Sequence, residues 1–160
     1  MTFETAMHGR TNHLELYISE AFMTGPGERT GPTMFTQNAG ARILSIAQRV
    51  DRLDVDVVTT ELSSILGATV VAVLGHATET RSVRAWAHGE YKPARADVLQ
   101  FALVLALVIA EFQGRDIVQA WFLGSNSWLN NANPMLVLGD RPLEQVRKPL
   151  MAAARAFALS

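Results

Sequence analysis

The sequence predicts an all-α protein, and three observations support this fold class. Apolar residues recur at helical spacing between Ile43 and Leu53, with arginines at positions between them. Residues 98–110 form an almost wholly apolar run, which is typical of a helix buried on nearly every face. Gly67 and Gly89 each follow a helical pattern, at the position where helices commonly end. These patterns predict short helices around one long apolar helix.

The composition is that of a folded protein. A chain of 160 residues suffices for one domain of ordinary size, or for two small helical modules that share a core. Hydrophobic residues make up 49% and charged residues 18%, which argues against extensive disorder. The formal net charge is -1, so the whole chain has no general affinity for polyanions. Binding to nucleic acid would therefore need a local basic patch.

Composition also indicates a compartment. There is no cysteine, which excludes disulfides and thiolate metal sites and is compatible with a reducing cytoplasm. The first residues show no basic start followed by an apolar stretch, so we expect no secretory signal. The apolar run 98–110 is shorter than the roughly 20 residues that a membrane-spanning helix needs. We therefore predict a cytoplasmic protein without membrane contact.

The amino-terminal half divides into an arm and a series of helices. Three glycines and two prolines in residues 24–33 end any helix, so residues 1–36 are expected to be an arm of uncertain order. The β-branched run that begins at Thr69 fits a short helix, although a strand is the alternative. Thr78 or Thr80 is expected to cap the next helix. The expected helices begin near Asn38 and cover about 56–66, 69–74, 80–88 and 94–112.

The carboxyl-terminal half is expected to be helical as well. After Gly114 a helix should present Ile117, Val118, Trp121 and Phe122 on one face. A polar loop with four asparagines follows at 125–134. Two further helices are expected at about 134–139 and 142–158.

The helix expected at 80–88 has one basic and one apolar side. Arg81, Arg84 and His88 are spaced three and four residues apart and share a face, while Val83 and Trp86 point elsewhere. Residues 81–95 contain four Lys or Arg and one acid, a local charge of +3. Such a helix can enter the DNA major groove. The candidate DNA-binding residues are Thr80, Arg81, Ser82, Arg84, His88, Lys92 and Arg95. The alternative interpretation is a solvated basic face above a core tryptophan.

The spacing in this region resembles the Xre-type helix-turn-helix over about residues 57–95. The shared pattern is T-x-x-V-x-x-W-x-x-G-x-x-x-P, found here as Thr80, Val83, Trp86, Gly89 and Pro93. The resemblance implies that the valine and tryptophan seat a recognition helix that the glycine ends. Members usually carry glutamine or arginine near the start of the preceding helix, where this chain has threonine and valine.

The second stretch, 114–158, resembles the toxin-binding domain of the Xre/MbcA/ParS antitoxin family. The matching residues are Trp121, Phe122, Asn126, Leu129, Pro134 and Leu138. Asn131 and Ala132 stand where glycine and a basic residue are commoner. An aromatic cluster at helical spacing can also be plain core, and Trp128 and Leu129 could join it. The alanine-rich end, residues 151–160, could instead form a terminal amphipathic helix that lies in a partner's groove.

The resemblance implies an antitoxin-like transcriptional regulator. It would have a helix-turn-helix DNA-binding domain at 37–112 and a partner-binding domain at 113–160. The implied partner is a RES-type toxin, which degrades NAD, and the regulator would also repress its own operon at a double-stranded DNA operator. A homodimer is expected, because helix-turn-helix proteins usually bind paired half-sites. The candidate partner-binding residues are Trp128, Asn130, Asn131, Arg155, Phe157 and Ser160.

Two other functions remain open from the sequence. One is a stand-alone repressor of a phage or mobile element with no toxin partner. The other is an interaction module whose basic helix meets an acidic protein. Catalysis is not expected, since the four histidines show no metal-ligand spacing. The glycine-rich stretch 25–31 lacks a P-loop lysine, so no cofactor is expected either.

Overall fold

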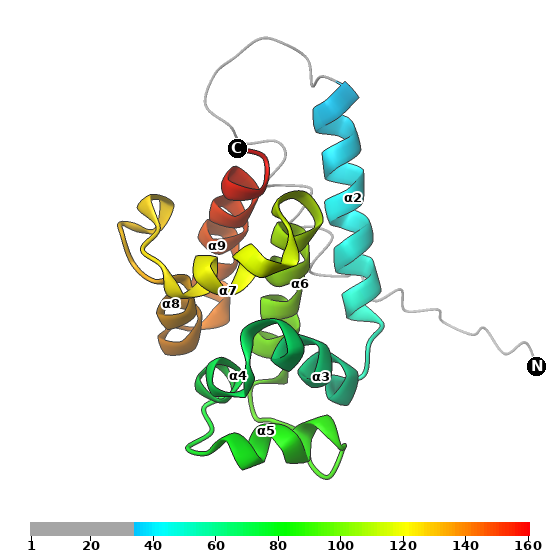
Figure 1. The fold of residues 1–160 in the computed structure, drawn as a ribbon, viewed down its shortest axis with the longest axis vertical. Helices are drawn as coiled ribbons and strands as arrows, with labels where there is room; N and C mark the ends of the chain where they lie inside the picture. The colour runs from blue at the N-terminus through cyan, green and yellow to red at the C-terminus, as the bar shows by residue number, and fades with distance from the viewer. Residues whose placement is uncertain (1–33) are drawn as a thin grey trace, which may run out of the picture.

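The computed structural model describes residues 34–160, with side chains from residue 37, and this part of the chain is almost entirely helical (Figure 1). Within it there is no β-strand, only an isolated bridge between Asn126 and Ala132. The all-α prediction is therefore confirmed, and the strand alternative at Thr69 is wrong. Most of the predicted arm, residues 1–33, lies outside the described residues, and its last three residues belong to a helix that begins at Met34.

The helices follow one another with short connections. Their bounds agree with the expected ones to within a few residues, because glycines end three of them, at 67, 89 and 114, with positive φ. In chain order they are α2 (Met34–Asp51), α3 (Val55–Leu66), α4 (Ala68–Leu74), α5 (Thr80–Ala87), α6 (Ala96–Gln113), α7 (Arg115–Leu123), the short 3₁₀ helix η1 (Ser127–Leu129), α8 (Pro134–Asp140) and α9 (Leu143–Ala158).

Helix α6 is the central element of the fold. It lies between the other helices and packs against α2, α3, α7 and α9 (Figure 1). Its residues from Val98 to Ile109 are buried almost without interruption, which explains why the sequence is apolar all round. By length and composition α6 is also the one helix of the described residues that could cross a membrane, and a buried core helix passes the same test.

One hydrophobic cluster runs through the whole described part. It extends from Ile43 in α2 to Ala158 in α9 and includes residues of every α-helix between them. The boundary predicted between residues 112 and 113 therefore falls inside this cluster, and the two predicted modules share a core. Helices of both predicted modules pack against α6.

Helix α9 is part of that core. The alanine-rich end does form the end of an amphipathic helix, as the sequence allowed, but the apolar face of this helix packs into the protein's own core. Met151, Ala153 and Ala154 are buried, since α9 packs along α6. The Gln113 side-chain amide Nε2 also donates hydrogen bonds to the carbonyl oxygens of Phe157 and Ala158, at 3.3 and 3.1 Å. These bonds satisfy carbonyls that a helix end leaves unpaired.

Candidate functional site

Helices α3, α4 and α5 form a compact group at one end of the molecule (Figure 1). α5 packs against both α3 and α4. As the sequence predicts, Val83 and Trp86 are buried on its inner side. α5 is thus held on the outside of the group by its own apolar face.

The turn between α4 and α5 depends on a close approach at Gly75. A Cβ atom at this position would lie 2.6 Å from two ring carbons of Trp86, far inside van der Waals contact. The backbone φ of Gly75 is -83°, which any residue can adopt, so the requirement is for space alone. The absence of a side chain lets the indole ring sit directly against the turn.

The start of α5 differs from the expected capping. Glu79 is the N-cap residue, in an extended conformation, and no side chain caps the helix. The prediction that Thr78 or Thr80 caps it is therefore wrong. The Glu79 carboxylate instead pairs with the Arg81 side chain, with 2.6 Å between Oε2 and Nε. The pair is solvent-exposed, so it contributes little to stability.

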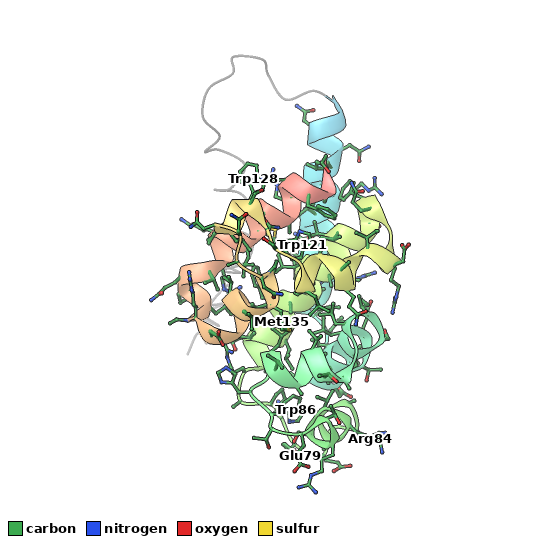
Figure 2. The ribbon with its side chains drawn as sticks, turned by 60° about the vertical axis from the view of Figure 1, so that its left-hand side comes forward. Glu79, Arg84, Trp86, Trp121, Trp128 and Met135 are labelled. Atoms are coloured by element: carbon green, nitrogen blue, oxygen red, sulfur yellow. The ribbon has the colours of Figure 1, made fainter. Side chains whose placement is uncertain are left out.

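The outward face of α5 carries its basic residues. The Arg81 side chain is 83% exposed despite its ion pair, and Arg84 and His88 are exposed too. Figure 2 shows Arg84 projecting from the end of the molecule and Trp86 on the inner side of α5. The central sequence prediction, two outward guanidinium groups on a short helix anchored by an indole, is confirmed.

Arg95 lies elsewhere than predicted. Its guanidinium was expected at DNA phosphates, but it donates hydrogen bonds to backbone carbonyls at the ends of two helices. The acceptors are Leu74 at 3.4 Å, Leu138 at 3.2 Å, Arg141 at 3.4 Å and Gly139. The prediction fails because these acceptors lie 21 to 46 positions away in the sequence. Arg95 is thus a structural residue that joins α4 to α8.

A histidine of the turn takes part in the same junction. The Nε2 atom of His76 lies 2.7 Å from the Gly139 carbonyl oxygen and 2.8 Å from Nη1 of Arg95. His76 adopts a left-handed conformation with φ of 58°, which is uncommon for a residue other than glycine. The turn before α5 is therefore fixed from both sides, by α5 itself and by α8.

The basic surface is smaller than the sequence predicts. Between residues 79 and 92 there are three basic side chains, Arg81, Arg84 and Lys92, and two acidic ones, Glu79 and Glu90, so the formal charge is +1. The +3 expected over residues 81–95 counted Arg95, which is turned inward, and left out Glu79. Because this net charge is small, attraction to a polyanion depends on where the individual side chains Arg81, Arg84 and Lys92 lie.

A groove borders this face. It measures about 330 Å³ and lies between α3 and α5, next to the start of α4. The α3 side of this groove, formed by Thr60 and Ser63, could not be predicted from the sequence. A threonine and a serine on a helix look like ordinary solvent-exposed positions. The lining residues are Thr60, Ser63, Ala68, Thr80, Arg81, Val83, Arg84 and Ala87.

A second hollow lies among α7, η1 and the end of α9. Its volume is about 430 Å³, and it brings together three predicted partner-binding residues, Trp128, Phe157 and Ser160. Trp128 is 66% exposed, so it does not join the core as the alternative interpretation held. Figure 2 shows it beside the end of α9, well separated from Arg84. Ile117 was expected on the buried face of α7 but is 38% exposed and lines this hollow.

Trp121 lies at the inner wall of the same hollow. It is buried and makes edge contacts with Phe122, at 5.2 Å between ring centroids, and a tilted contact with Phe157 at 6.5 Å. Its indole Nε1 is buried and has no hydrogen-bond partner among the described residues. The hollow is therefore lined by the aromatic rings of Trp121 and Phe157, and the exposed Trp128 lies at its edge. The Trp121 indole nitrogen is a buried hydrogen-bond donor beside it.

The asparagines of the loop build its shape. The side chain of Asn126 accepts a hydrogen bond from the Trp128 amide at 2.9 Å, and that of Asn133 accepts one from the Leu136 amide at the start of α8. Asn130 and Asn131 both adopt left-handed conformations, with φ of 55° and 61°. Asparagine tolerates this region better than most residues, as the sequence analysis expected. The loop thereby presents Trp128 to solvent.

Three of the predicted partner-binding residues, Asn130, Asn131 and Arg155, do not line the hollow. The Arg155 side chain is half-buried in α9. Burial lowers the pKa of the Arg155 guanidinium below its ordinary value, since desolvation disfavours the charged form. Its position indicates a role within the helix packing.

The described residues contain no group of three or more His, Cys, Asp or Glu side chains that could hold a metal ion. Comparison of the chain with protein-family models, with curated proteins and with solved structures found no match.

Proposed function

We propose that the protein is a DNA-binding transcriptional regulator that places α5 in the major groove. The observation that carries the proposal is the two-sided character of α5, with Val83 and Trp86 buried and Arg81 and Arg84 exposed at the outer end of the molecule. An α-helix with its side chains is about 10–12 Å across, so it fits the major groove, which is about 12 Å wide. Arginine is the residue that pairs best with guanine there.

The hollow at Trp128 supports a second role, the binding of a protein partner. An exposed tryptophan beside an apolar hollow is a common feature of protein interfaces, because burying its ring on association is strongly favourable. The resemblance of residues 114–158 to the toxin-binding domain of the Xre/MbcA/ParS family suggests a RES-type toxin as that partner. The regulator would act in the cytoplasm as a homodimer, repress its own operon, and have no catalytic role.

The stand-alone repressor is the second candidate. Such a repressor would bind DNA through the outward face of α5. It would leave the exposed Trp128, which the surrounding loop holds in place, without a function. The observation therefore favours a regulator with a partner. A basic α5 that meets an acidic protein is a weaker candidate, because the local charge is only +1.

DNA binding is tested with the fragment upstream of the protein's own gene. We expect the logarithm of the association constant to fall linearly with the logarithm of salt concentration, because Lys and Arg release counterions from phosphates. Arg81→Ala and Arg84→Ala should both weaken binding, whereas Arg49→Ala, an exposed change in α2, should not. Fluorescence anisotropy measures all four proteins. A wild-type affinity that does not depend on salt would exclude the DNA-binding function.

Partner binding is tested by co-purification with the product of a neighbouring RES-type gene. Trp128→Ala should abolish co-purification without lowering the melting temperature, since the side chain is mostly exposed. Exposed Leu136→Ala in α8 is the matched control, because its side chain lies outside the hollow. Unchanged co-purification of the Trp128 variant would remove this surface from the mechanism.

A further inference from the structure

The groove between α3 and α5 has the chemistry of an anion site. Two arginines, Arg81 and Arg84, line it together with three residues that carry hydroxyl groups, and no acidic residue does. Arg84 forms no ion pair within residues 37–160, whereas Arg81 is partly neutralised by Glu79. Arg84 is therefore the stronger cation for an incoming anion.

The hydroxyl groups of the groove differ in what they can still donate. Thr60 Oγ1 already donates to the carbonyl oxygen of Asp56 at 2.8 Å, so its one hydrogen is in use. Ser63 Oγ is buried in the groove wall and has no hydrogen-bond partner among the described residues. Such a group is costly unless an acceptor arrives, and a serine hydroxyl reaches one by rotation about a single bond. Thr80 is exposed at the first residue of α5 and faces the same groove.

We propose that this groove seats one phosphate group of the DNA backbone, bound by Arg84 and the hydroxyl groups of Ser63 and Thr80. The proposal rests on the proposed DNA-binding function. A backbone strand runs along each side of the major groove, so a helix lying in that groove has phosphates beside it. The groove borders α5 on its α3 side, where such a strand would pass.

Phosphate binding in this groove gives the basic residues of α5 different roles at the DNA. Arg84 lies between the groove and the outward face, so it acts on the phosphate and fixes the position of the helix. Arg81, at the edge of the groove, and His88, about two turns further along the outward side, are left to face base edges. α3, which sequence analysis treated only as support for α5, becomes part of the DNA interface through Ser63.

The test compares two neighbouring serines of α3 on a mixed-sequence 20-base-pair duplex, where only backbone contacts count. Ser63→Ala should weaken binding about three- to ten-fold on any sequence, the effect of one lost hydrogen bond. The salt dependence should stay unchanged, because the side chain is neutral. Ser64→Ala is the control: its hydroxyl lies outside the groove, donates to the carbonyl of Glu61 and accepts a hydrogen bond from Arg115. Thr80→Val gives a second, independent variant at the α5 wall.

Arg84→Ala should weaken binding to all sequences alike and lower the steepness of the salt dependence by about 0.9. Melting temperatures show whether each variant is folded. If the wild-type protein binds DNA and Ser63→Ala and Thr80→Val both bind as tightly as Ser64→Ala, the seat is refuted and the DNA-binding function stands. If no protein binds DNA, the proposed function itself fails.

A second measurement separates the backbone from a free anion. Inorganic phosphate is titrated into the ¹⁵N-labelled protein, and we expect weak binding with amide shifts at Ser63 and Thr80. These shifts should disappear in Ser63→Ala and persist in Ser64→Ala. Phosphate shifts combined with normal duplex binding by Ser63→Ala would assign the groove to a small anion and overturn the proposal.

Discussion

A single guanidinium group, that of Arg95, ties the carboxyl-terminal ends of two helices together. It donates to carbonyls of α4 and α8, the groups that a helix end leaves unpaired. A positive charge also interacts favourably with the carboxyl-terminal end of a helix dipole. Because α4 precedes α5 and α8 follows the Trp128 loop, this residue connects the two candidate surfaces.

Arg95→Ala should therefore destabilise the protein. The loss of several charged hydrogen bonds and the exposure of unpaired carbonyls should lower the free energy of unfolding by about 2–3 kcal/mol. Urea denaturation measures this quantity. Lys92→Ala, an exposed change three residues earlier, should stay within about 0.5 kcal/mol of the wild type. Equal effects of the two changes would contradict the structural role of Arg95.

At the scale of elements, the short helices depend on packing more than on their own propensity. α4 and α5 span seven and eight residues, lengths at which an isolated helix is not stable in water. α5 is held by Val83 and Trp86 alone, through contacts with α3, α4 and the turn at Gly75. The orientation of Arg81 and Arg84 is thus set by the burial of the indole.

Helix α9 contains an internal proline, Pro149, on its exposed side. A proline inside a helix removes one backbone hydrogen bond and strains the preceding turn. Pro149→Ala should therefore raise the free energy of unfolding by about 1–3 kcal/mol. Urea denaturation is again the measurement. Lys148→Ala, at another exposed position of α9, controls for the effect of the added alanine. If the Pro149 variant were less stable than the wild type, the proline would give α9 a shape that the core requires.

At the scale of the whole molecule, one core supports both candidate surfaces. α6 contacts α3, which carries α5, and also α7 and α9, which line the hollow at Trp128. Neither half can lose α6 without exposing apolar side chains.

The two predicted modules should consequently unfold together. Methyl resonances of Val58 in α3 and Leu150 in α9, both buried, should disappear at the same urea concentration. Far-UV circular dichroism should give that midpoint as well. Two separate midpoints would mean that residues 37–112 and 113–160 are independent domains, as the sequence alone allowed.

The sequence by itself determined the helices, the burial of Trp86 and the outward direction of Arg81 and Arg84. These features follow from helical spacing and from glycines at helix ends, which are local properties of the chain. Three features were decided only by the tertiary structure: Arg95 bonds α4 to α8, Trp128 is exposed, and Ser63 faces α5 across a groove. The roles of Arg95 and Ser63 depend on contacts between residues far apart in the chain, and the exposure of Trp128 depends on the conformation of its loop; helical spacing encodes neither.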